Sequence, residues 1–119
     1  MESKILVASR DEDCHKNLHE MFKDRQITIH TVSDEADLLL ALLDGDYNAL
    51  IYDLEFSALD SLKMVKILRK LRPKISLVVL SNDSSKELGG KVLQEGIAYY
   101  GIKPIYSQTI SRVLSNVLS

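Results

Sequence analysis

The chain has little of several features that mark specialised classes of protein. Of its 119 residues only Cys14 is a cysteine, so no disulfide forms within the chain. No apolar run approaches the roughly 18 residues that a membrane span needs. Lys and Arg number 15 against 17 Asp and Glu, and this net charge of −2 gives no basic character for binding nucleic acid or acidic membranes. We expect one cytoplasmic domain over residues 1–119, because no secretion signal is visible.

What the sequence does contain is a regular alternation of short apolar runs with segments of helical period. The segments between the runs are long enough to cross over between parallel strands. The pattern therefore predicts an α/β fold, a doubly wound five-stranded parallel sheet with helices on both faces. The predicted strands are residues 5–8, 27–32, 49–52, 75–80 and 97–102.

The strand order can also be predicted. Residues 27–32 alternate apolar and polar side chains, which is typical of an edge strand, whereas the first, third and fourth runs are continuously apolar. An edge position for the second strand favours the order 2-1-3-4-5. In that order the switch point lies between strands one and three, and ligands bind there at the carboxyl ends of the strands.

Local signals mark the ends of the helices. Gly45 predicts a left-handed turn after the second helix, and the third helix, about 60–71, should end before Pro73. Residues 84–87 form a capping box that opens the fourth helix. The last helix carries one apolar stripe that should lie on the sheet: Ile110, Val113, Leu114, Val117 and Leu118.

Polar side chains follow the predicted strands at this edge: Ser9 and Arg10, Asp53, Ser81 and Lys103. A carboxylate beside a lysine and a hydroxyl can be a nucleophile toward a phosphoryl group, with the other two groups binding its oxygens. The same groups can equally form an ion pair that closes the top of the sheet. The residues alone leave both interpretations open.

The stretches KILVAS, ALIYDL, LVVLSND and YYGIKPI each fall on a predicted strand. On these stretches the chain resembles the response-regulator receiver family of two-component signalling, over essentially its whole length. The resemblance implies a flavodoxin-like (βα)5 fold with Asp53 as phosphoacceptor and with Ser81 and Lys103 on the phosphoryl group. It also implies that Tyr100 is an aromatic switch that moves with Ser81, and that the bond before Pro104 is cis. The function implied is a switching module, not an enzyme.

The main departure from the family lies at the first strand. Receivers carry two adjacent acids there that hold Mg²⁺, and this chain has Ser9 and Arg10 instead. The exchange makes the site about three formal charges more positive, which disfavours the ion and leaves Asp53 as a doubtful metal ligand. Using Asp11 instead would shift the first strand by one residue and turn its side chains to the opposite face. We therefore place the acids 11–13 beyond the site.

We also expect Arg10 to pair with Asp53. Three functional hypotheses follow. In the first, the chain is a pseudo-receiver that keeps the fold and the interaction surface, while phosphorylation is absent or very slow. In the second, Asp53 accepts a phosphoryl group with Arg10 in place of magnesium. In the third, the chain is a flavodoxin-like nucleotide or flavin binder, which is disfavoured because residues 9–14 contain no glycine.

The expected partners follow from the resemblance: a histidine kinase or other signalling protein, and an output domain in a longer chain. Residues 84–119 form the surface on which receivers dimerise, with apolar contacts from Ile102, Ile105 and Tyr106. We expect no nucleic acid or membrane partner for this domain. The basic run Arg69, Lys70, Arg72 and Lys74 is explained by cations favouring a helix C-terminus.

One further cluster has the spacing of a metal site. His15 and His19 are four residues apart, so they share a helical face beside Cys14, a spacing that can bind zinc. No additional ligand is apparent in the sequence. The preferred interpretation is two solvated histidines beside a small buried thiol.

Overall fold

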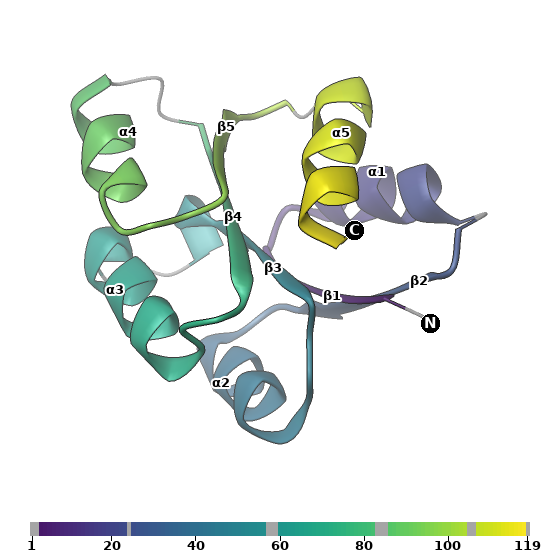
Figure 1. Ribbon diagram of the computed structural model, residues 1–119, viewed down its shortest axis with the longest axis horizontal. Helices are drawn as coiled ribbons and strands as arrows, with labels where there is room; N and C mark the ends of the chain where they lie inside the picture. The colour runs from purple at the N-terminus through teal and green to yellow at the C-terminus, as the bar shows by residue number, and fades with distance from the viewer. Residues whose placement is uncertain (1–2, 24, 57–59, 83–85, 105–106, 119) are drawn as a thin grey trace.

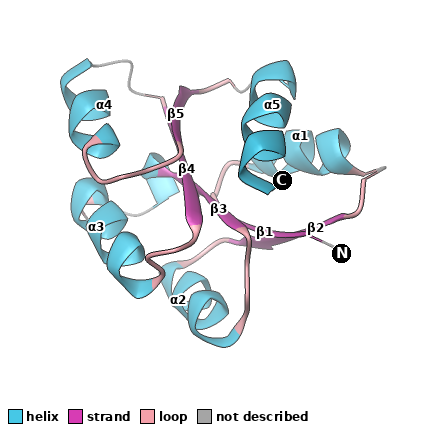
Figure 2. Ribbon diagram, in the orientation of Figure 1, coloured by secondary structure: helices cyan, strands magenta, loops and turns pink. Residues whose placement is uncertain are grey.

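The predicted architecture is confirmed: the sheet is parallel, its order is β2-β1-β3-β4-β5, and helices cover both faces (Figures 1 and 2). The computed structural model describes residues 3–23, 25–56, 60–82, 86–104 and 107–118. The strands are β1 Ser3–Ala8, β2 Ile27–Val32, β3 Ala49–Asp53, β4 Ser76–Ser81 and β5 Tyr99–Ile102. The helices are α1 Glu12–Phe22, α2 Glu35–Asp44, the short 3-10 helix η1 Leu54–Phe56, α3 Ser61–Leu71, α4 Lys86–Leu93 and α5 Ser107–Leu118.

Alternate residues of each strand enter two separate cores. Ile5 and Val7 pack with α1 and α5, whereas Leu6 and Ala8 face α2, α3 and α4 on the other side of the sheet (Figure 1). All four residues are fully buried. Because a buried aliphatic side chain contributes about 1.5–3 kcal/mol, this alternation fixes which residues face each layer.

The register places the first and third strands side by side. Ala8 lies opposite Tyr52 in the parallel pairing of β1 with β3. On its other side β1 pairs with β2, whose burial alternates as an edge strand requires. The carboxyl ends of β1 and β3 therefore meet at the switch point, as the sequence predicted.

Aspartates begin three of the helices. Asp11 Oδ1 accepts hydrogen bonds from the amides of Asp13 and Cys14 at 3.0 and 3.3 Å, so Asp11 caps α1. Asp34 caps α2 and Asp60 caps α3 in the same way. Such caps contribute about 1 kcal/mol each to stability, and here they also set the residue at which each helix begins.

The expected left-handed turn at Gly45 is wrong. Gly45 is extended, with φ of −115°, and a Cβ there would lie 2.8 Å from Cε2 of Tyr47, so any other residue would require that ring to shift. The left-handed glycine is Gly96, with φ of 76°. The proposed capping box at 84–87 has its first two residues outside the described residues.

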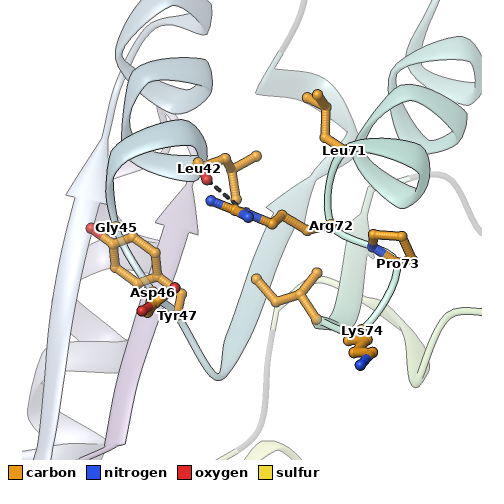
Figure 3. A pocket seen from close by; sticks show the side chains of 9 residues that line it. Leu42, Gly45, Asp46, Tyr47, Leu71, Arg72, Pro73 and Lys74 are labelled. Atoms are coloured by element: carbon orange, nitrogen blue, oxygen red, sulfur yellow. Dashed lines mark hydrogen bonds between the residues drawn. The ribbon is translucent and has the colours of Figure 1, made fainter.

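At the amino ends of β3 and β4, opposite the switch point, a hollow of about 360 Å³ lies between the ends of α2 and α3. Arg72 reaches across it, and its Nε donates to the carbonyl of Leu42 at 2.7 Å (Figure 3). Arg69 likewise donates to the carbonyls of Pro73 and Ile75. These two arginines of the basic run thus satisfy backbone carbonyls near helix ends. Within the described residues, no helix has the length and apolar character to cross a bilayer.

Candidate functional site

Asp53, the last residue of β3, lies at the centre of the polar site and is 2% exposed. Its Oδ2 accepts hydrogen bonds from Ser9 Oγ at 2.8 Å and from Lys103 Nζ at 2.7 Å. Its Oδ1 accepts the amide of Glu55 at 3.1 Å. The structure therefore brings two of the predicted site residues, Ser9 and Lys103, to the carboxylate of a third, Asp53.

Arg10 is not among them, so the expected ion pair between Arg10 and Asp53 is wrong. Its Nε donates to the carbonyl of Ser33 at 3.1 Å, and its guanidinium lies 5.4 Å from the centre of the Phe56 ring. The reason is the alternation along β1: Ser9 continues the face of Val7, so the next residue turns to the other face. Arg10 thus leaves the site in which its neighbour takes part.

Lys103 is shared by three carboxylates. Besides its bond to Asp53, Nζ lies 3.6 Å from Asp11 Oδ2 and 3.8 Å from Glu55 Oε2, and the lysine side chain is 8% exposed. Placing Asp11 beyond the site was therefore wrong. The side chain comes back toward Lys103 because Asp11 caps α1, and this needs no shift in the register of β1.

Ser81, the last residue of β4, reaches the site through a residue that the sequence analysis missed. Ser81 Oγ donates to Glu55 Oε1 at 3.2 Å, and the amide of Asn82 donates to the same oxygen at 2.6 Å. Glu55 stands between the buried residues Leu54 and Phe56. An acid between two apolar residues just after a strand end is the sequence signal that could have identified Glu55 as a site residue.

The ionisation of the site follows from these contacts. Burial alone would raise the pKa of Asp53, but hydrogen bonds with Glu55, Lys103 and the Ser9 hydroxyl hold it below its usual value. Burial, and then the adjacent Asp53, raise the pKa of Glu55. For Lys103, burial would lower the pKa, but the bond to Asp53 outweighs it and the pKa is raised. Asp53 and Lys103 therefore form an ion pair.

The two tyrosines of β5 point to opposite faces, as predicted. Tyr99 packs against the core beneath α1 and α5, and Tyr100 against the core beneath α2, α3 and α4. Tyr100 is half-buried, with its Cε1 3.2 Å from where a Cβ on Gly89 would stand. The Lys103–Pro104 bond is cis, as the resemblance implied.

Of the apolar residues expected on the dimer surface, Ile102 is 41% exposed. Ile105 and Tyr106 lie outside the described residues. The structure thus places one of the three on the surface.

Of the cluster Cys14, His15 and His19, Cys14 lines the side of the site. A hollow of about 260 Å³ beside Lys103 is bordered by Asp11, Cys14, Asn82 and Pro104, among others. Burial, chiefly, raises the pKa of the Cys14 thiol to about 11, whereas a zinc ligand must be a thiolate. In the described part of the chain, no three His, Cys, Asp or Glu side chains are grouped to hold a metal ion.

The sheet order, with an acid, a hydroxyl and a lysine at its carboxyl edge, defines a receiver-like α/β domain. Residues 5–115 match the model of the response regulator receiver domain, and the chain belongs to that family. It is therefore a receiver domain of two-component signalling. No curated protein sequence matches the chain.

Solved structures share the fold at low sequence identity. A signal receiver domain of an HD domain-containing protein from Pseudomonas fluorescens Pf-5 is 21% identical, with a TM-score of 0.89, covering 99% of this chain and 95% of that one. A response regulator from Thermotoga maritima is 15% identical, with a TM-score of 0.89 and coverages of 99% and 98%. A response regulator protein from Burkholderia pseudomallei, crystallised with a phosphorylated aspartic acid, calcium ion and citrate, is 19% identical, with a TM-score of 0.83 and coverages of 98% and 69%.

Proposed function

We propose that this chain is a pseudo-receiver, a binding and switching module whose Asp53 does not take up a phosphoryl group by the magnesium-dependent route. One observation carries the proposal: the Ser9 hydroxyl and the Lys103 ammonium both bind Asp53 Oδ2, at 2.8 and 2.7 Å. Ser9 stands where other receivers carry a metal-binding acid. The Ser9 hydroxyl is thus hydrogen-bonded to the same Asp53 oxygen that pairs with Lys103.

The contacts of Asp53 reduce its reactivity as a nucleophile. Phosphoryl uptake forms a bond between a carboxylate oxygen and phosphorus while the bond from phosphorus to the donor breaks. Oδ2 already accepts two hydrogen bonds, one of them charge-assisted, and Oδ1 accepts the Glu55 amide. A carboxylate whose pKa is held low is also a weaker nucleophile. An attack through Oδ2 would first have to break one of its two hydrogen bonds.

The residues at the site do not fit a magnesium ion. Mg²⁺ requires oxygen ligands in a near-octahedral array, usually including carboxylates. Here the three nearby carboxylates are gathered around Lys103 Nζ, which supplies the positive charge between them. The Burkholderia relative was crystallised with a calcium ion and a phosphorylated aspartate, and this chain lacks the acid pair that its family uses for the cation.

The alternative, in which Arg10 replaces magnesium, is less well supported. Its guanidinium donates to the carbonyl of Ser33 and lies over the ring of Phe56. To reach a phosphoryl group on Asp53 it would have to give up both contacts and cross to the opposite face of β1. The hypothesis therefore needs a rearrangement that the pseudo-receiver does not.

A small phosphoryl donor, supplied with and without Mg²⁺ and followed by intact mass measurement, tests the proposal. We expect no adduct on the native chain, and a magnesium-dependent adduct on the double variant Ser9→Asp with Arg10→Asp, which restores the acid pair. Asp53→Asn in that background is the control and should abolish the adduct. A stable adduct on the native chain that disappears in Asp53→Asn would overturn the proposal. If that adduct also disappears in Arg10→Ala, the arginine alternative replaces it.

A further inference from the structure

Three hydrogen-bond donors of different kinds converge beside Asp53. The Ser81 hydroxyl and the Asn82 amide come from the end of β4, and the Lys103 ammonium follows β5. The hydroxyl and the amide donate to one oxygen of a carboxylate, and the ammonium lies 3.8 Å from the other oxygen, an arrangement that suits an oxyanion such as phosphate. A carboxylate of the chain itself already occupies this place and accepts hydrogen bonds from the hydroxyl and the amide.

We propose that Glu55 is a built-in ligand of this oxyanion receptor, and that its carboxylate excludes phosphate-type anions by occupying their place. Oε1 accepts from Ser81 Oγ at 3.2 Å and from the Asn82 amide at 2.6 Å, while Oε2 lies 3.8 Å from Lys103 Nζ. The inference rests on the proposed pseudo-receiver function and names a second residue that keeps the site closed. Glu55 therefore decides which anion the receptor holds.

The backbone around Glu55 holds the carboxylate in position. Leu54 and Phe56 on either side are buried in the core, and the Glu55 amide donates to Asp53 Oδ1. Because the buried flanking side chains hold η1 in place, binding of the carboxylate at the receptor restricts only the side-chain torsions of Glu55. An internal ligand held in this way competes with a dissolved anion at a high effective concentration.

The negative charge of the site also disfavours binding of a dissolved anion. Three carboxylates surround Lys103, namely Asp11, Asp53 and Glu55. A dissolved phosphate would add further negative charge a few ångströms away, where each unit of repulsion is substantial. Removing Glu55 relieves one of these charges and also removes the acceptor of the Asn82 amide, so two effects must be separated by experiment.

The chain offers matched variants that separate occupancy from charge. Asp11→Asn removes one negative charge beside Lys103, and Asn remains a good helix cap, but Glu55 still fills the receptor. Glu55→Gln removes the charge of Glu55 and keeps an oxygen that can accept from Asn82. Glu55→Ala removes both the charge and the acceptor.

The test is a titration of each variant of the 119-residue chain with inorganic phosphate, monitored through the NMR amide signal of Asn82. In the native chain and in Asp11→Asn we expect no saturable shift. Glu55→Ala should show saturable binding at least about tenfold tighter than any binding by Glu55→Gln, a difference easily resolved in such a titration. The Asn82 signal of phosphate-free Glu55→Ala should also differ from that of the native chain, since it has lost its acceptor.

Several results would overturn the inference. The first is that Glu55→Ala does not bind phosphate. The second is that the native chain binds phosphate as tightly as Glu55→Ala does. The third is that Asp11→Asn or Glu55→Gln binds as tightly as Glu55→Ala, which would show that charge, and not occupancy, excludes the anion. Because the readout is reversible binding, it is independent of phosphoryl transfer to Asp53. A covalent adduct on the native chain would overturn the pseudo-receiver proposal, whereas the titration alone decides the role of Glu55.

Discussion

The hydroxyl of Ser9, which under the proposed function stands in place of a metal-binding acid, donates a 2.8 Å hydrogen bond to Asp53 Oδ2. Both side chains are buried, at 1% and 2% exposure. Two carboxylates at these positions would repel each other unless a cation lay between them, whereas a hydroxyl and a carboxylate attract. The substitution thus lets the site be stable with only the protein's own charges.

Ser9→Ala should destabilise the fold by about 1–2 kcal/mol, because a hydrogen bond to a buried charged group is lost. A double-mutant cycle with Asp53→Asn isolates this bond, and we expect a coupling free energy of about 1 kcal/mol. Urea unfolding at neutral pH measures both quantities. Strictly additive losses would show that the Ser9 hydroxyl does not contribute through Asp53.

Lys103→Met should cost about 3 kcal/mol or more of unfolding free energy, because it leaves the buried Asp53 without its cation. The matched control is Lys91→Met, whose lysine pairs with Glu87 on the exposed face of α4 and should cost less than about 0.5 kcal/mol. Chemical denaturation of the two variants provides the comparison. Similar losses in both would argue against a buried ion pair at Lys103.

Glu55 should make stability depend on pH in a definite direction. Its pKa is raised above the ordinary 4.5 by burial and by Asp53, so the folded chain keeps this proton to a higher pH than the unfolded chain does. The stabilisation is complete below the ordinary value and is lost as the pH rises through the folded value. Glutamine does not titrate, so Glu55→Gln should gain stability relative to the native chain between about pH 4 and pH 7.

Urea unfolding across that pH range measures the difference, with Glu20→Gln as the control. The pKa of Glu20 is lowered by its hydrogen bond to Lys23, so its contribution has the opposite sign. Glu20→Gln should therefore lose stability relative to the native chain as the pH rises. A difference for Glu55→Gln that is constant with pH, or that falls, contradicts the assignment.

The sequence predicted the sheet and its order because strand and helix periods depend on burial, which the residue pattern records directly. The same alternation that rejects a shifted register for Asp11 also directs Arg10 away from Ser9, and the ion pair with Asp53 was wrong because that rule was applied to the strand but not to the residues after it. From Asp11 onward, the direction of a side chain depends on the helix cap that follows the strand, and periodicity does not contain that information.

Asp11 and Glu55 are the two site residues that sequence reasoning missed. Asp11 enters the site because its cap on α1 turns it toward Lys103, and Glu55 enters because η1 follows Asp53 directly. Both side chains are placed by backbone turns of two or three residues. In contrast, Ser81 ends β4 and Lys103 directly follows β5. Both strands have a fixed register, so the place of these two residues at the edge that holds Asp53 could be predicted from the order of the strands.

The adjacent glycines of α4 test the packing of Tyr100. Both lie inside a helix, where replacing glycine by alanine stabilises by about 1 kcal/mol. A Cβ at Gly90 would meet nothing within 4 Å, whereas one at Gly89 would lie 3.2 Å from Cε1 of Tyr100. Gly90→Ala should therefore gain nearly the full amount, and Gly89→Ala should gain less because the ring has to shift.

Urea unfolding measures the two gains, and NMR signals of the Tyr100 ring report whether it moves. We expect the ring signals to change in Gly89→Ala and to stay unchanged in Gly90→Ala. Because the two substitutions add the same atom to neighbouring positions of one helix, helix propensity cancels in the comparison. Equal gains with an unmoved ring would mean that Tyr100 does not pack on Gly89.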